Sequence, residues 1–89
     1  MNTYRFKITG KVQGVSYRKS IQQMAAMGQL QGYIKNQKDG SVEAVVFLYD
    51  DQLEDFISLL KNGSSLSKVD DISYEVIEEE MIYDGFMIK

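Results

Sequence analysis

The first part of the chain alternates between apolar and polar residues and then changes to a helical period. Between Thr3 and Thr9, an aromatic or aliphatic residue takes every second position, which predicts a strand with one buried face. From about Tyr17 to Met27 the apolar residues recur instead at steps of three and four, which predicts an amphipathic helix. The residues expected on its buried side are Tyr17, Ile21, Met24, Ala25 and Gly28.

Two strands are predicted in the middle of the chain, followed by a second helix. Gly32–Asn36 and Ser41–Tyr49 are expected to form a hairpin through the turn Lys38-Asp39-Gly40. The acidic pair Asp50-Asp51 is expected to cap the helix, with Glu54 in a capping-box relation to Asp51. Asn62-Gly63 should end this helix. Its buried stripe is expected to consist of Leu53, Phe56, Ile57 and Leu60.

The last part of the chain predicts two more strands and completes the order of elements. Ile72–Glu79 alternates, with Ile72, Tyr74 and Val76 on one side, and Phe86–Lys89 can form a short final strand. The order is β-α-β-β-α-β with an extra strand at the end. It predicts the α+β class and a ferredoxin-like sandwich, an antiparallel sheet with both helices on one face.

Composition limits what such a chain can be. Its 89 residues predict one domain, residues 1–89, with a packed core because 44% of the residues are hydrophobic. Without Cys, the chain can form neither disulfides nor a thiolate metal site. No apolar run approaches the roughly 20 residues of a membrane span. We therefore expect a cytoplasmic monomer that binds no membrane.

The charges divide unevenly along the chain. Residues 1–40 contain seven Lys or Arg and one Asp, whereas residues 41–89 contain three Lys and twelve Asp or Glu. A basic half on an acidic protein suggests a local anion site rather than a groove for nucleic acid. Solubilising charge with chance clustering explains the same division, and composition alone does not decide between the two.

A candidate anion site lies in the stretch G-K-V-Q-G-V-S-Y-R between the first strand and the first helix. Glycines let the backbone curl until consecutive amides converge, and the helix adds a partial positive charge at its first turn. The Arg18 guanidinium can fold back over the same point. A structural turn with a solvated Arg is the alternative. The loop residues of the candidate site are Gly10, Lys11, Val12, Gln13, Gly14, Val15, Ser16 and Tyr17.

The residues that are absent narrow the chemistry. The chain has no His and no Cys, so it lacks the usual imidazole base, thiolate nucleophile and zinc ligands. An enzyme with an amide cradle and one Arg needs a leaving group that departs without protonation. An acyl phosphate has one, since a carboxylate has a pKa of about 4. Asn36, at the end of a predicted strand, can orient water without ionising, or can simply form a turn.

Two motifs together resemble the acylphosphatase family. Gly10–Arg18 is similar to its first signature, and Gly32–Asn36 with the following Q-K-D-G-S-V is similar to its second. The resemblance covers essentially the whole chain. It implies that Arg18 and the loop amides bind phosphate and that Asn36 orients the attacking water. Because the chain has no His or Cys ligands, we expect that neither cofactor nor metal is needed. The implied substrate is a small acyl phosphate.

The sequence departs from the family pattern at three places. The family usually has Gly where this chain has Leu48, and a small residue where it has Gln37. The glycine that usually ends the first helix is replaced by Gln29, with Gly28 one position earlier. Both proposed catalytic residues are intact, so these changes bear on stability and rate more than on the reaction.

Two other functions fit the same predicted fold. A single-stranded RNA binder would use strand aromatics such as Tyr33, Phe47 and Tyr49, but the acidic balance and the missing RNA-binding signature argue against it. A small-ligand regulatory domain would usually be fused to an enzyme. Inhibition by inorganic phosphate would indicate the hydrolase, and a steep salt dependence of RNA binding would indicate the binder.

Overall fold

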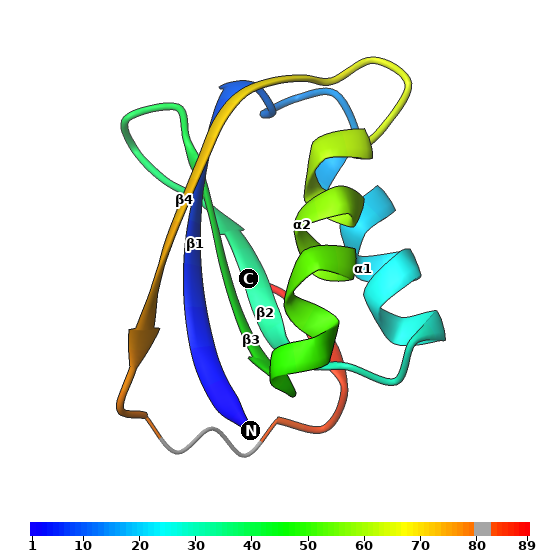
Figure 1. Ribbon diagram of the computed structural model, residues 1–89. Helices are drawn as coiled ribbons and strands as arrows, with labels where there is room; N and C mark the ends of the chain where they lie inside the picture. Colours follow the sequence, from blue (N-terminus) through cyan, green and yellow to red (C-terminus); the bar gives the residue numbers. More distant parts are fainter. Residues whose placement is uncertain (80–82) are drawn as a thin grey trace.

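A computed structural model describes residues 1–79 and 83–89 and confirms the predicted order of elements (Figure 1). Within these residues, none of the helices is long and apolar enough to span a membrane. The predicted bounds of the first helix are confirmed. The elements are β1 (Asn2–Lys11), α1 (Tyr17–Met27), β2 (Gln31–Asn36), β3 (Val42–Leu48), a 3₁₀ turn (Asp50–Gln52), α2 (Leu53–Asn62), β4 (Lys68–Ile77) and β5 (Phe86–Ile88).

The described strands form one sheet in the order β4-β1-β3-β2-β5, with both helices on one face (Figure 1). The ferredoxin-like fold is thereby confirmed, but the sheet is not purely antiparallel. β5 pairs with β2 in parallel, with Gly32 opposite Phe86. The register places the end of β4 and the start of β2 at the same end of the sheet. A strand that is entered from that end must run in the direction of β2.

The core lies between the sheet and the two helices. Tyr4, Phe6 and Ile8 of β1 are buried there, because alternate residues of a strand point to the same face. α2 contributes Phe56 and Leu60, while Leu53 and Ile57 are only partly buried. Leu48 is also fully buried in this core.

The buried stripe of α1 is narrower than predicted. Tyr17, Ile21 and Ala25 are buried, whereas Met24 is 53% exposed and Gly28 is exposed. The buried residues are spaced by four, which keeps them on one line of the helix facing the sheet. Met24 is off that line, one residue before Ala25, and stays largely exposed.

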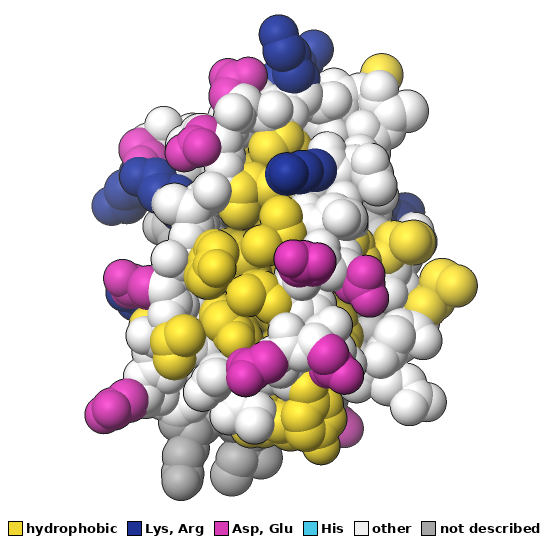
Figure 2. Space-filling model, viewed as in Figure 1, with side chains coloured by type: hydrophobic (Ala, Val, Ile, Leu, Met, Phe, Trp, Pro, Cys, Tyr) yellow, Lys and Arg dark blue, Asp and Glu magenta, His cyan; other side chains and the backbone are white. Residues whose placement is uncertain are grey.

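β4 has Ile72, Tyr74 and Val76 on one side, as predicted, and this apolar face is largely exposed. Tyr74 and Val76 are 49% and 56% exposed, and Ile72 is only partly buried. These side chains point to the helix side, but β4 is an edge strand and α2 does not reach across it. A hollow of about 470 Å³ remains between α2 and β4, and Figure 2 shows apolar side chains along it with acidic residues around them.

The end of α2 at Asn62 and Gly63 is as predicted, whereas its start differs from the predicted cap. Asp50 and Asp51 belong to the 3₁₀ turn, and the reciprocal contact is the Tyr49 amide donating to Gln52 Oε1 at 2.8 Å. The predicted box of Asp51 and Glu54 is therefore wrong, because the chain enters α2 through an additional turn. At the end of α1, Leu30 N donates to Ala25 O at 3.0 Å and Gln29 is left-handed (φ 57°), a Schellman arrangement without its usual glycine.

Candidate active site

The loop between β1 and α1 is shorter than predicted and is held by contacts to the core and to the segment after α2. Gly10 and Lys11 extend β1 and pair with β4, which leaves Val12–Ser16 as the open loop. Val12 and Val15 are buried in the core. The Ser64 hydroxyl, in the segment after α2, donates to the Val15 carbonyl at 2.6 Å. The loop is thus attached by side chains and by a carbonyl, and not by its backbone amides.

The amides of this loop are open. Within the described residues, none of the backbone N–H groups of Val12–Ser16 donates to another protein group. Gly14 (φ 72°) and Ser16 (φ 61°) are left-handed, while residues 13 and 15 have negative φ. Alternation of this kind turns successive N–H groups toward one point and forms an anion-binding concavity.

Helix α1 adds its N-terminus to this loop. Its first turn contains no acidic residue, and Ser16 makes no side-chain cap. The first helical hydrogen bond is donated by the Ser20 amide to Ser16 O, so the amides before it remain free for a ligand. The Tyr17 side chain takes no part, because its hydroxyl donates to Leu60 O at 2.7 Å inside the core, where burial raises the pKa of Tyr17.

Arg18, the second residue of α1, is partly buried and is directed toward β2 and β5. Its Nη1 donates to Lys89 O at 3.1 Å, and the Lys89 amide donates to Ile34 O at 2.9 Å. The Lys89 ammonium lies 4.0 Å from the centre of the Tyr33 ring. These contacts bring the guanidinium beside β2, two residues before Asn36. A guanidinium has five N–H donors, so most of them remain available to an anion.

Asn36 is the last residue of β2 and lies opposite Val42 of β3. It is exposed, and its side-chain amide makes no hydrogen bond to the part of the chain that the structure describes. The turn after it, residues 37–41, is closed by its own bonds. Gln37 N donates to Ser41 O at 2.8 Å, and both the amide and the hydroxyl of Ser41 donate to Asp39 Oδ1.

A model of the acylphosphatase family matches residues 4–88. The chain belongs to the acylphosphatase family. An acylphosphatase of Bacillus subtilis (strain 168) is 42% identical over 73 residues, which are 82% of this chain and 80% of that protein. A crystal structure of acylphosphatase from Bacillus subtilis has a TM-score of 0.91 at 37% identity and covers 100% of this chain and 99% of its own. An acylphosphatase structure from Coxiella burnetii has a TM-score of 0.88 at 31% identity, covering 99% and 92%.

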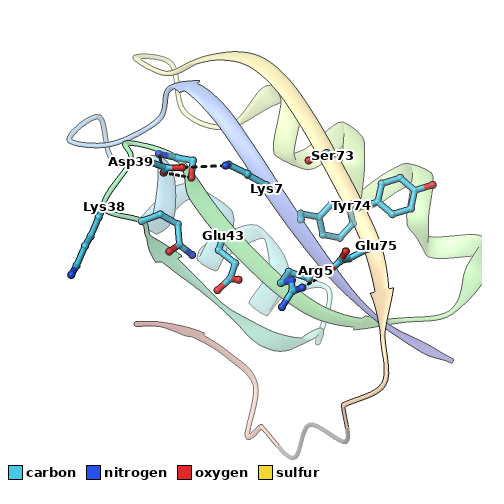
Figure 3. A pocket seen from close by; sticks show the side chains of 11 residues that line it. Arg5, Lys7, Lys38, Asp39, Glu43, Ser73, Tyr74 and Glu75 are labelled. Atoms are coloured by element: carbon cyan, nitrogen blue, oxygen red, sulfur yellow. Dashed lines mark hydrogen bonds and ion pairs between the residues drawn. The ribbon is translucent and has the colours of Figure 1, made fainter.

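One large hollow in the described surface includes residues of the second motif after Asn36, namely Gln37, Lys38, Asp39 and Ser41, but it is not lined by the loop Val12–Ser16, by Arg18 or by Asn36. It is an open groove of about 780 Å³ on the side of the sheet away from the helices (Figure 3). Two ion pairs join residues of its lining: Arg5 with Glu75, and Lys7 with Asp39 at 3.1 Å. We place the site at the loop, because a phosphate-sized anion needs converging donors more than it needs volume.

Sequence reasoning missed two contributions to this candidate site. Lys89 holds Arg18 through its carbonyl, and no local pattern signals this because the contact exists only after β5 has paired with β2. Gln13 was assigned to the loop for its backbone amide, but its side chain turns away and contacts the residues after Asn36. Gln13 lies between Val12 and Val15, which are both buried. A polar side chain in such a stretch could have indicated a buried hydrogen bond.

Proposed function

We propose that the protein hydrolyses acyl phosphates, with the loop amides and Arg18 holding the phosphate and Asn36 orienting the attacking water. Membership of the acylphosphatase family supports the reaction. The observation that carries the assignment of the site is the open, left-handed loop Val12–Ser16 beside the start of α1. The phosphate dianion replaces solvent on these amides, and no protein hydrogen bond has to break.

Arg18 supplies the charge that the amides lack. Its contact to Lys89 O uses one N–H and holds the planar group in place, so binding needs little further ordering of the side chain. The remaining donors form charge-assisted hydrogen bonds to the phosphate oxygens. Negative charge that accumulates on these oxygens in the transition state is stabilised by the same donors.

Asn36 acts on the nucleophile. Its amide both donates and accepts, and it can therefore fix a water molecule in line with the bond to be broken. The water oxygen forms a bond to phosphorus, and the bond between phosphorus and the acyl oxygen breaks with its electron pair. The acyl group leaves as a carboxylate, which requires no proton because its pKa is about 4. The water proton passes to the phosphate product or to solvent.

The open face of the sheet does not favour RNA as a ligand. Tyr33 is covered by Tyr83, at 5.7 Å between ring centres, and by the Lys89 ammonium. Burial, and then the Glu43 carboxylate, raise the pKa of Tyr33 to about 12. Stacking with a base would require these contacts to open. A monomer of one domain, located in the cytoplasm, remains our proposal for the protein as a whole.

The test is hydrolysis of benzoyl phosphate, followed in the ultraviolet, with purified protein in excess chelator. We expect full activity and competitive inhibition by inorganic phosphate. Loss of activity in chelator with recovery on addition of magnesium or zinc would contradict a metal-free mechanism. Absence of hydrolysis under all conditions would contradict the proposed reaction.

A further inference from the structure

The Gln13 side chain joins the loop to the turn that follows Asn36. Its Nε2 donates two hydrogen bonds, to Gln37 O and to Ser41 O, each at 2.8 Å. The side chain is partly buried between the two segments. Among the described residues, these are the only hydrogen bonds between the loop Val12–Ser16 and the turn of residues 37–41.

The chemistry of the partners fixes the orientation of this amide. Both partners are backbone carbonyl oxygens, which accept and never donate. The nitrogen must therefore face them, because the reversed amide would place Oε1 against two oxygens. Both N–H groups of Gln13 are used in this way. The Gln13 side chain consequently has no donor left to bind a phosphate.

The two carbonyls flank Asn36 in the fold. Gln37 directly follows Asn36, and Ser41 directly precedes Val42, which lies opposite Asn36. The turn already closes through the Gln37 amide and Ser41 O, so it does not need Gln13 in order to form. What Gln13 adds is the attachment of a closed turn to the loop.

We propose that Gln13 is a positioning residue that sets the distance and direction between the loop amides and the side-chain amide of Asn36. The inference rests on the proposed function, because it concerns the alignment of water with the bound phosphate. A displacement of about 1 Å between reacting groups can cost on the order of 10²-fold in rate. Gln13 therefore affects turnover through Asn36 and leaves phosphate binding to the loop and Arg18.

Replacement Gln13→Met keeps the length of the side chain and removes both donors. We expect kcat for benzoyl phosphate to fall roughly 10- to 100-fold. The inhibition constant of inorganic phosphate should change less than about 3-fold, because uniform binding is unaffected. Gln22→Met is the matched control: it removes another Gln amide, which donates to Phe86 O at 3.2 Å, and it should retain kcat.

A double-mutant cycle with Asn36→Ala distinguishes an effect of Gln13 that acts through Asn36 from a general loss of structure around the site. If Gln13 acts through Asn36, adding Gln13→Met to Asn36→Ala should cost less than about 3-fold more in kcat. Multiplication of the two separate losses would overturn the inference, and so would wild-type kcat in Gln13→Met. A loss of phosphate affinity as large as the loss of kcat would also overturn it.

Gln13→Glu provides a second readout if the Met variant folds poorly. Its ionised carboxylate would face two carbonyls, whereas the protonated form can donate to one of them. Its kcat relative to wild type should therefore recover as the pH falls from 7 to 5, and a flat ratio overturns the inference. If the wild-type protein does not hydrolyse benzoyl phosphate, the proposed function fails. If wild type is active and Asn36→Ala is slow but Gln13→Met is unimpaired, only the role of Gln13 fails.

Discussion

The two turns that face each other at the site use their backbone amides in opposite ways. In the loop Val12–Ser16, no amide donates to another described protein group. In the turn of residues 37–41, the amides of Gln37, Gly40 and Ser41 all donate within the turn. Both turns contain a left-handed glycine, Gly14 at φ 72° and Gly40 at φ 94°. Sequence composition does not distinguish the two turns. They differ in whether their backbone amides donate hydrogen bonds to other protein groups.

We call the loop Val12–Ser16, whose amides are open, the binding turn. We call residues 37–41, whose amides are paired, the holding turn. Amides that are unpaired and converge can stabilise an anion without prior rearrangement. Amides that are already paired give a rigid support, here for Asn36, whose own side chain stays free. We propose that the first turn provides phosphate affinity and that the second aligns the attacking water, and substitutions in each turn test this.

Arg18→Ala should have the largest effect, because it removes the only side-chain cation that we assign to the binding turn. We expect kcat/KM to fall by about 10³-fold, with weaker inhibition by phosphate, since the contact acts in both the ground and transition states. Steady-state kinetics with benzoyl phosphate measure both. Arg18→Lys should rescue poorly, because an ammonium cannot make two parallel contacts. Lys19→Ala is the control for charge, and wild-type behaviour of Arg18→Lys contradicts the bidentate role.

Asn36→Ala should affect turnover alone. We expect kcat to fall on the order of 10²–10³-fold while phosphate still binds. Asn36→Asp should be inactive at neutral pH, because its charge lies near an anionic substrate. Phosphate inhibition, kcat and Tm measured on the same sample decide the matter. Normal turnover per folded molecule together with a lowered Tm would mean that Asn36 serves only as a turn former.

Gly14→Ala and Gly40→Ala form a matched pair across the two turns. An added Cβ meets no atom within 4 Å at either position, so the main cost is left-handed backbone, about 1 kcal/mol in each case. Denaturant unfolding should show similar losses of stability. Only Gly14→Ala should weaken inhibition by phosphate, by several-fold. A backbone shift at Gly14 moves amides that we propose bind the phosphate, whereas the amides around Gly40 bind none. Equal weakening in both variants would remove the distinction between the turns.

Asp39→Asn tests the holding turn by pH and should have the smallest effect. Hydrogen bonds from Ser41, and then the Lys7 ammonium, hold the pKa of Asp39 well below its usual range. A lowered pKa contributes stability above the usual carboxyl pKa of about 4, and this contribution is lost as the pH falls through the lowered value. The Tm difference from wild type should be constant near neutral pH and shrink below about pH 4. Phosphate affinity should not change, and a difference in Tm that grows on acidification is the contrary result.

Local pattern was sufficient to predict most of the fold. The first helix and the hairpin of β2 and β3 follow from periodicity and turn residues, and two motifs located Arg18 and Asn36. The features that local pattern did not predict are contacts between elements. The exposure of Tyr74 depends on the position of β4 at the edge of the sheet, and the parallel pairing of β5 depends on which end of the sheet it enters. The two bonds of Gln13 likewise require the loop and the turn to be assembled first.

The left-handed conformation of Gln29 lowers the stability of the protein, and a substitution at this position could raise it. A non-glycine residue in the left-handed region costs roughly 1 kcal/mol, and Gln29 is exposed at the end of α1. Gln29→Gly should remove this strain at some entropic cost and raise the free energy of unfolding by up to about 1 kcal/mol. Denaturant unfolding would measure the gain, with unchanged kcat as the check. The variant would then be a tolerant host in which damaging substitutions at the site could be purified in folded form.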